Sequence, residues 1–226
     1  MGYLPIFIDV QGRTCLVVGG GEVGRRKVEG LIEGGAVVRL VSRDLDSRLA
    51  DLTGQGRVEY LGREYRTEHL DGAVLVFAAT DDPQLNARVS REAQARGLLV
   101  NVADQPRLCT FIVPASVRRG DLTLAVSTGG GSPALAARIR AELEAQFGPE
   151  YAEFLKVLRL VREKVLAEGR PAEENKSKFQ RLIASDLLER LVRGDAAGAE
   201  AVLTQILGPG FTFAALGYRP AGEARP

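Results

Sequence analysis

Short apolar runs alternate with amphipathic segments over the first hundred residues. After the first run, apolar side chains recur at the spacing of one helix face, at Val23, Val28, Leu31 and Ile32. A second helix is predicted over 82–97, because Asp82 and Pro83 favour its start and Gly97 its end. The apolar runs themselves predict strands at 13–21, 36–42, 57–62, 73–80 and 98–103. This alternation predicts an α/β fold with a Rossmann-like, doubly wound parallel sheet.

The pattern changes after Pro106. Two further strands are predicted at 109–116 and 121–128, joined by a turn over 117–120. A helix over 134–147 follows, and from Pro149 onward the chain has helical spacing at 150–169, 177–194 and 196–208. We therefore expect three parts: a Rossmann domain over 1–113, a small α+β segment over 114–148 and a helical C-terminal domain over 149–226.

Composition and charge narrow the class of protein. The 226 residues are 45% hydrophobic and 26% charged, which is typical of a globular chain. The net charge of +1 provides no overall field to attract nucleic acid or an anionic membrane. No apolar run approaches the roughly 20 residues that a membrane helix needs, and the N-terminus lacks the features of a secretory signal. We expect neither nucleic acid nor membrane as a partner.

Cysteine and histidine are scarce. Cys15 and Cys109 are the two cysteines, and His69 is the single histidine. Two cysteines are too few for a disulfide framework, which indicates a reducing, cytoplasmic location. The same scarcity argues against a preformed metal site. Cys15 lies in an apolar run, where a cysteine is usually a small buried hydrophobic residue.

The first glycine loop indicates a dinucleotide. Gly19, Gly21 and Gly24 form a G-x-G-x-x-G motif between a predicted strand and a predicted helix. The first glycine allows a tight turn, the second lets the backbone approach a pyrophosphate, and the third allows close packing of helix on strand. The pyrophosphate would lie at the helix N-terminus. A purely structural glycine turn is the alternative.

The residues after two other strands bear on the choice of cofactor. Many nicotinamide sites have an acid at the end of the second strand, whereas this chain has Ser42, Arg43 and Asp44 there. Asp44 favours the ribose hydroxyls of NAD, and Arg43 could meet the 2′-phosphate of NADP. We take NAD as the cofactor and leave NADP open. Ala79 and Thr80 end the fourth strand, where small residues would pass beneath the adenine ribose; capping of the next helix is the alternative.

A second glycine loop, STGGGSP over 127–133, also lies between a strand and a helix. Ser132 is placed as the N-cap and Pro133 as the first helical residue. Three glycines exceed what a cap needs, so their N–H groups suit an anion such as a carboxylate. Nearby arginines suit a polycarboxylate, although each could instead be solvated. The candidate substrate-binding residues are Thr128, Gly129, Gly130, Ser132, Arg107 and Arg119.

Taken together, these motifs resemble the precorrin-2 dehydrogenase/sirohydrochlorin ferrochelatase family, the N-terminal module of siroheme synthase. The resemblance covers most of residues 3–147 and is most specific in NVAD, CTF, PA, RGDL and STGGGSP between 101 and 133. It implies NAD-dependent oxidation of precorrin-2 to sirohydrochlorin, and in some members insertion of Fe²⁺ as a second substrate. In fused siroheme synthases a methyltransferase domain follows this module, and we expect this chain to be the stand-alone form.

The resemblance also assigns residues. The essential aspartate of the family falls on Asp104, which could act as the base when the macrocycle loses a hydride and a proton. Asp104 as a turn residue before Pro106 is the alternative. Nucleotide contacts of the family fall on Glu22 and Val23 and on Arg43 and Asp44. A phosphorylatable serine of the family corresponds to Thr128, and the segment after the nucleotide domain forms a homodimer interface.

Two other classes of protein compete with this interpretation. An NAD(H)-sensing regulatory module would share the first glycine loop, but it offers no reason for the second loop or for the segment around Asp104. A different NAD-dependent reductase would need catalytic His, Lys or Tyr groups, and the sequence contains no such constellation.

Overall fold

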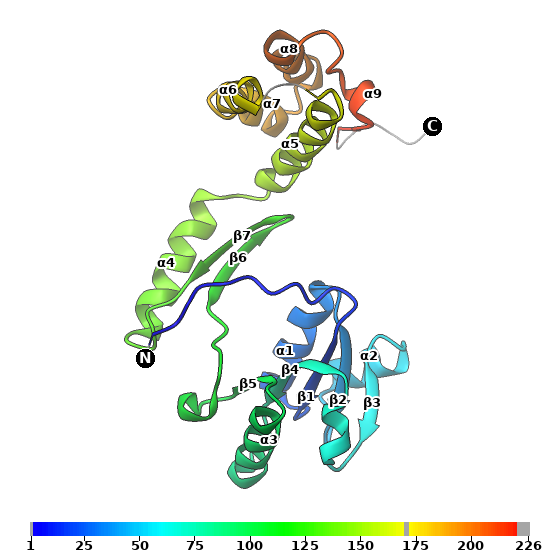
Figure 1. Ribbon diagram of the computed structural model, residues 1–226, viewed down its shortest axis with the longest axis vertical. Coiled ribbons are helices and arrows are strands. Elements are labelled where there is room, and N and C mark those ends of the chain that lie inside the picture. The colour runs from blue at the N-terminus through cyan, green and yellow to red at the C-terminus, as the bar shows by residue number, and fades with distance from the viewer. Residues whose placement is uncertain (1, 170–171, 221–226) are drawn as a thin grey trace. The chain divides into compact units, whose positions relative to one another are not determined.

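The computed structural model describes residues 2–169 and 172–220. The chain folds as two compact units, which divide between Val113 and Pro114 (Figure 1). Each unit has its own hydrophobic core, and each is described by itself.

The first unit is built on a five-stranded parallel sheet with the strand order β3-β2-β1-β4-β5. In the central register, Val17 lies opposite Leu40 of β2 and Phe77 of β4. This arrangement confirms the predicted Rossmann-like, doubly wound sheet. Its strands are β1 (Thr14–Val18), β2 (Val37–Val41), β3 (Glu59–Gly62), β4 (Ala73–Ala78) and β5 (Leu99–Val102).

Helices cover both faces of this sheet because strand side chains alternate between the faces. Cys15 and Val17 of β1 pack with α1 (Glu22–Glu33) and α2 (Ser47–Gly54). Leu16 and Val18 pack with α3 (Pro83–Ala95) on the opposite face. Two short 3-10 helices, η1 (Thr67–Leu70) and η2 (Pro106–Leu108), complete the unit. Helix α2 lies where the hydrophobic pattern predicts no element.

The predicted start of α3 is confirmed in detail. Pro83 is the first helical residue, and the Asp82 carboxylate accepts hydrogen bonds from the N–H groups of Gln84 and Leu85 at 2.9 and 3.1 Å. Gly97, just beyond the helix, has a φ of +70°. The helix therefore begins and ends where its capping residues predict.

The hairpin of the second unit is displaced from its predicted position. Strands β6 (Ala115–Arg119) and β7 (Leu122–Val126) pair antiparallel, with Arg119 opposite Leu122. The turn is at Gly120 and Asp121, and the predicted turn over 117–120 is therefore wrong. Gly120 adopts a φ of +57°, which favours glycine. Residues before Pro114 do not join this hairpin, since Thr110 instead bonds to Val100 of the first unit.

The remaining helices form a second core. After α4 (Pro133–Gln146), apolar side chains of the helices that follow meet around Val157, Leu187 and Leu203, each fully buried. The segment predicted as one helix over 177–194 is broken at Ser185, whose hydroxyl donates to the Leu182 carbonyl. The helices are α5 (Glu150–Ala167), α6 (Ala172–Ile183), α7 (Leu187–Val192), α8 (Ala196–Leu207) and α9 (Phe213–Leu216).

A membrane-crossing helix is not found in the described part of the chain: no helix there has both the length and the hydrophobicity that a bilayer requires.

Burial of Cys15 in β1 gives a testable pH dependence of stability. The side chain is fully buried, and burial raises the pKa of its thiol to about 11, from 9.0. The folded state therefore keeps a proton that the unfolded chain loses, and stability present below pH 9 falls as the pH rises towards 11, by at most about 3 kcal/mol. Denaturant unfolding at about pH 8 and about pH 10.5 should show a smaller loss in Cys15→Val than in the natural chain. Equal losses in both proteins would contradict this assignment.

Candidate active site

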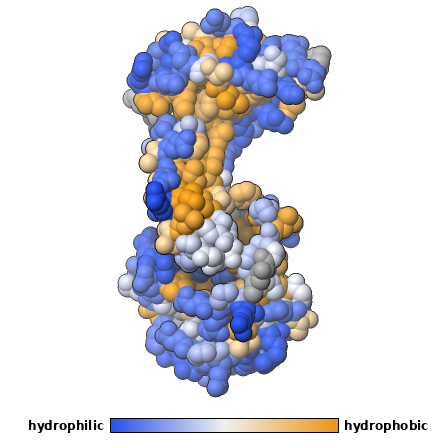
Figure 2. All heavy atoms as spheres, turned by 90° about the vertical axis from the view of Figure 1, so that its left-hand side faces the viewer, coloured by the Kyte–Doolittle hydropathy of each residue, from blue (hydrophilic) through white to orange (hydrophobic). Residues whose placement is uncertain are grey.

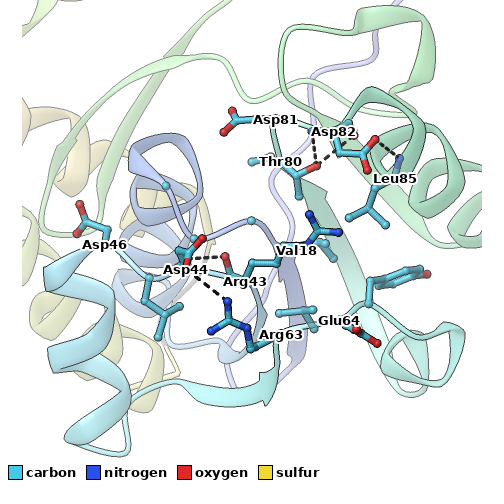
Figure 3. A pocket seen from close by; sticks show the side chains of 18 of the residues that line it. Val18, Arg43, Asp44, Asp46, Arg63, Glu64, Thr80, Asp81, Asp82 and Leu85 are labelled. Atoms are coloured by element: carbon cyan, nitrogen blue, oxygen red, sulfur yellow. Dashed lines mark hydrogen bonds and ion pairs between the residues drawn. The ribbon is translucent and has the colours of Figure 1, made fainter.

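A pocket of about 810 Å³ opens at the carboxyl ends of the strands of the first unit (Figure 3). The glycine loop forms one wall, and the segments that follow β2, β3 and β4 form the others. Open parallel sheets bind their ligands at this edge, and the volume is in the range of cofactor sites. Of the predicted cofactor residues, those that line the pocket are Gly19, Gly21, Arg43, Asp44, Ala79 and Thr80.

The three glycines of the first loop meet different constraints. Gly19 has a φ of +119°, and a Cβ there would lie 2.2 Å from the Ala79 carbonyl oxygen. A Cβ on Gly24 would lie 2.0 Å from the Gly19 carbonyl oxygen, so helix and strand approach too closely for a side chain. A Cβ on Gly21 would meet no atom within 4 Å. Gly19 and Gly24 are thus needed by the fold, whereas Gly21 leaves space open at the pocket wall.

The N-terminus of α1 has no side-chain cap. Its N-cap residue is Gly21, whereas Asp46 caps α2 and Asp82 caps α3. The first N–H groups of an α-helix, here those of Glu22, Val23 and Gly24, have no acceptor within the helix. Donors at the positive end of a helix beside an open cavity are suited to a pyrophosphate. These residues fit the diphosphate of a dinucleotide.

The segment after β2 places two opposite charges at the pocket. Figure 3 shows the Arg43 side chain extending into the pocket, on the side of Thr80. The Asp44 carboxylate is 93% exposed and lies 3.7 Å from Arg63. The Ser42 hydroxyl closes the turn that carries both residues, because it donates to the Asp44 carbonyl at 2.6 Å. The pocket wall thus carries one carboxylate and one guanidinium, and their predicted roles toward a ribose or a 2′-phosphate stay predictions.

Thr80 is held in place by a residue that the sequence analysis missed. Asn86 of α3 is 2% exposed; its amide oxygen accepts from the N–H and hydroxyl of Thr80, and its amide nitrogen donates to the Thr80 carbonyl. A buried amide with all three of these bonds fixes the turn after β4. The available sequence signal was the position of Asn86 in the first turn of the predicted helix that follows the candidate residue Thr80.

The pocket also contains side chains that sequence reasoning did not bring together. Arg63 and Tyr65 follow β3, and Arg88 extends from α3. Glu92 orients this group: it accepts hydrogen bonds from the Tyr65 hydroxyl at 2.9 Å and from Arg88 Nε at 2.8 Å. Burial and the bond to Glu92 raise the pKa of Tyr65. The position of Arg63 directly after a parallel strand was the available signal.

Asp104 lies outside this pocket, in the loop that follows β5. It is exposed, and it is the only non-glycine residue with a positive φ, +56°, among the described residues. Its carboxylate makes no hydrogen bond or ion pair within the described chain, so the turn-residue alternative has no bond to support it. The carboxylate of Asp104 is therefore available to a ligand, and its role as the base stays a prediction.

The half-buried Lys27 of α1 lies near the loop that carries Asp104, and residues of this loop influence its pKa. Burial lowers the pKa of the Lys27 ammonium, while the nearby Cys109 and Asp104 raise it. The ammonium lies 5.7 Å from the centre of the Phe77 ring. Helix α1 thus brings a cation close to the Asp104 loop, which the sequence analysis did not anticipate.

The predicted substrate residues fall in both units. Arg107 lies in η2 of the first unit and is exposed. In the second unit, Gly129 and Gly130 have positive φ and open space around their Cβ positions. The Thr128 hydroxyl bonds to both the N–H and the carbonyl of Ser132, and the Ser132 hydroxyl caps α4 by accepting from the Leu135 N–H. The second loop therefore holds itself together and leaves the backbone of its glycines exposed.

Arg119 is engaged at the end of α4. Its guanidinium donates to the Phe147 carbonyl at 3.0 Å and to the Glu144 carbonyl at 3.4 Å, and it pairs with the Glu144 carboxylate at 3.5 Å. These bonds satisfy carbonyl groups that a helix C-terminus leaves free. Little donor capacity is left on Arg119 for a substrate carboxylate.

Comparison with known proteins agrees with this geometry. An NAD(P)-binding family model matches residues 6–115, and the model of the sirohaem biosynthesis protein central region matches residues 119–146. The siroheme synthase of Pseudomonas entomophila (strain L48) is 45% identical over 203 residues, which cover 90% of this chain and 44% of that protein. The siroheme synthase of Methylobacillus flagellatus is 41% identical over 207 residues, covering 92% and 44%. This chain thus spans less than half the length of these relatives.

A solved structure supports the same relationship. SirC, a precorrin-2 dehydrogenase, matches with a TM-score of 0.72 and 25% identity over 90% of this chain and 98% of its own. The match covers both units, and together with the NAD(P)-binding model it supports the predicted cofactor NAD. The chain is therefore similar over most of its length to siroheme synthases and to a precorrin-2 dehydrogenase, which confirms the resemblance that its motifs predict.

Proposed function

We propose that this chain catalyses the NAD-dependent dehydrogenation of precorrin-2 to sirohydrochlorin. The observation that carries the proposal is the pairing, in one unit, of an open pyrophosphate cradle at Gly21 with a free carboxylate at Asp104. The family supports the choice of substrate, because a SirC precorrin-2 dehydrogenase aligns along nearly its whole length.

The nucleotide would be held by backbone and side chains of the first unit. The N–H groups at the start of α1 bind the diphosphate, and Gly21 leaves room for it. Asp44 and Arg43 lie where the adenosine ribose is recognised. When bound, NAD supplies a hydride acceptor.

Asp104 would supply the base. Dehydrogenation removes a hydride and a proton from the macrocycle, and the proton needs an acceptor. A carboxylate oxygen of Asp104 takes that proton, because the side chain is exposed and its oxygens are not used within the described chain. Lys27 of α1 places a positive charge near this loop.

Each unit, taken by itself, offers candidate groups for substrate carboxylates. Arg107 supplies an exposed guanidinium in the first unit. In the second unit the candidate backbone donor is the Gly130 N–H, because the N–H groups of Gly129 and Gly131 donate to the Ser127 hydroxyl and the Thr128 carbonyl. Arg107 is the stronger candidate of the two predicted arginines, because the Arg119 donors bond to the end of α4. Thr128 and Ser132 shape the second loop and contribute through its backbone.

The active form would be a homodimer, and its interface would involve β6, β7 and α4. In these elements only Val117 and Ala136 are buried, while Leu135 is 48% exposed. Figure 2 shows a hydrophobic band along α4. The hairpin and α4 pack against each other, and their remaining exposed apolar side chains need a second surface to cover them.

Light scattering of the Leu135→Asp variant tests this proposal. The natural chain should scatter as a dimer at micromolar concentration, and Leu135→Asp should shift it towards the monomer because a charge replaces an apolar contact. Leu166→Asp is the matched control, since Leu166 is a 61% exposed leucine on α5 of the same unit. A monomeric natural chain, or dissociation by both variants alike, would contradict the predicted interface.

The function itself is tested by supplying anaerobically prepared precorrin-2 with NAD or with NADP and following the reduced nucleotide. We expect turnover with NAD, and weaker turnover with NADP. Binding of NAD without turnover would favour the nucleotide-sensing alternative. Adding Fe²⁺ after oxidation then tests whether this chain also inserts iron. The proposed cytoplasmic location rests on its two free cysteines.

A further inference from the structure

The loop that carries Asp104 closes the outer edge of the sheet. Strand β5 is an edge strand, so the N–H groups of Val100 and Val102 on its outer side have no strand partner. After the loop, the chain turns back along this edge, and the Thr110 N–H donates to the Val100 carbonyl at 2.8 Å. The Val100 N–H in turn donates to the Thr110 hydroxyl at 2.8 Å. Side chains thus take the place of a sixth strand.

The Cys109 side chain likewise provides an acceptor for the next outward-facing N–H group of β5, that of Val102. Its sulfur accepts the Val102 N–H at 3.1 Å. It lies 3.3 Å from the Val102 carbonyl and 3.4 Å from the Gln105 carbonyl, and its single S–H proton can be donated to either. The thiol therefore bonds to the backbone on both sides of Asp104, two residues before it and one residue after it.

The position of Asp104 depends on these backbone bonds. Its own carboxylate has no partner in the described chain, and its φ of +56° is one that most residues avoid. A left-handed residue at the tip of a loop persists only where the surroundings hold it. Those surroundings are the Cys109 thiol and two loop bonds, from Gln105 N–H to the Val102 carbonyl and from Leu108 N–H to the Gln105 carbonyl.

We propose that Cys109 is a positioning residue for Asp104: its thiol holds the two backbone segments that flank the aspartate and so places the carboxylate. This inference rests on the proposed function, in which Asp104 is the base. Serine at position 109 would keep one donor and one acceptor, whereas alanine would remove both and leave the Val102 N–H without its acceptor. Serine and alanine are therefore the informative pair of variants.

The experiment compares Cys109→Ala, Cys109→Ser and the natural chain in two independent measurements. Amide hydrogen exchange at Val102 reports the loop without any need for activity, and steady-state oxidation of precorrin-2 reports kcat and KM. In Cys109→Ala we expect exchange at Val102 at least about 10-fold faster. We also expect kcat to fall about 10- to 100-fold, with the Kd for NAD unchanged. Cys109→Ser should remain within about threefold of the natural chain in both.

Cys15→Ala is the control for loss of a thiol that lies elsewhere. Cys15 is fully buried in β1, so this variant should lower the Tm without changing exchange at Val102 or kcat. Equal impairment of Cys109→Ser and Cys109→Ala would overturn the proposal, and so would faster exchange in Cys109→Ala with an unchanged kcat. If the natural chain does not oxidise precorrin-2, the proposed function fails, while exchange at Val102 still shows whether the thiol holds the loop.

Discussion

Replacing Asp104 by asparagine should lower the kcat for precorrin-2 oxidation by about 10²–10⁴-fold, the range for loss of a positioned general base. The Kd for NAD should stay within about twofold, because Asp104 lies outside the nucleotide pocket. The melting temperature should barely change, because the carboxylate makes no bond in the described chain. Reduced-nucleotide formation, nucleotide titration and a thermal melt measure the three quantities.

Asparagine is the right substitution because of the backbone at this position. With a φ of +56°, Asp104 lies in the left-handed region, which asparagine tolerates and alanine does not. Asp104→Ala would destabilise the folded backbone by about 1–2 kcal/mol, so a loss of activity could not be separated from a loss of stability. Asp51→Asn, on the exposed face of α2, controls for the same change in charge. Turnover close to that of the natural chain in well-folded Asp104→Asn would exclude Asp104 as the base.

Replacing Gly21 by aspartate should abolish nucleotide binding and leave the fold intact. The new Cβ meets no atom within 4 Å, and Gly21 has an ordinary φ of −79°, so the substitution is sterically tolerated. Its side chain and negative charge, however, enter the space predicted for the diphosphate. We expect the Kd for NAD to rise at least about 10²-fold, which corresponds to about 2.7 kcal/mol. Calorimetric titration measures the Kd, and precorrin-2 oxidation should disappear with it.

Two other glycines provide the controls for this experiment. Gly30→Asp places the same side chain on the same helix, in open space outside the pocket, and should bind NAD normally. Gly24→Ala should instead destabilise the unit, because its Cβ would lie 2.0 Å from the Gly19 carbonyl oxygen. A folded Gly21→Asp protein with normal affinity for NAD would show that the loop does not hold the diphosphate.

Much of the first unit could be predicted from local sequence. The strand at β4 and the helix α3 follow from an apolar run and from the caps at Asp82 and Gly97. Such signals are local, because burial periodicity and capping act within a few residues of the chain. The glycine motif could also be recognised from the sequence, because the steric constraints on Gly19 and Gly24 arise between the first unit's strands and the helix that follows the loop.

Sequence reasoning failed where neighbours outside the segment decided the structure. The hairpin was misplaced because residues 109–111 have strand-like composition, yet Thr110 bonds along the edge of β5 rather than to β7. Helix α2 was missed because its burial comes from Leu49 and Leu52, two side chains in an otherwise polar stretch, packing beside α1.

The amino-acid sequence by itself therefore determined the type of fold and the family resemblance, and it identified the first glycine loop and Asp104 as candidates for the cradle and the base. Only the tertiary structure decided that Arg63, Tyr65 and Arg88 share one pocket and that the Cys109 thiol bonds on both sides of Asp104. It also showed that the donors of Arg119 are engaged at the end of α4. The physical reason is that a motif states which groups lie next to each other along the chain, whereas a hydrogen bond between distant residues depends on the register and packing of the elements that carry them.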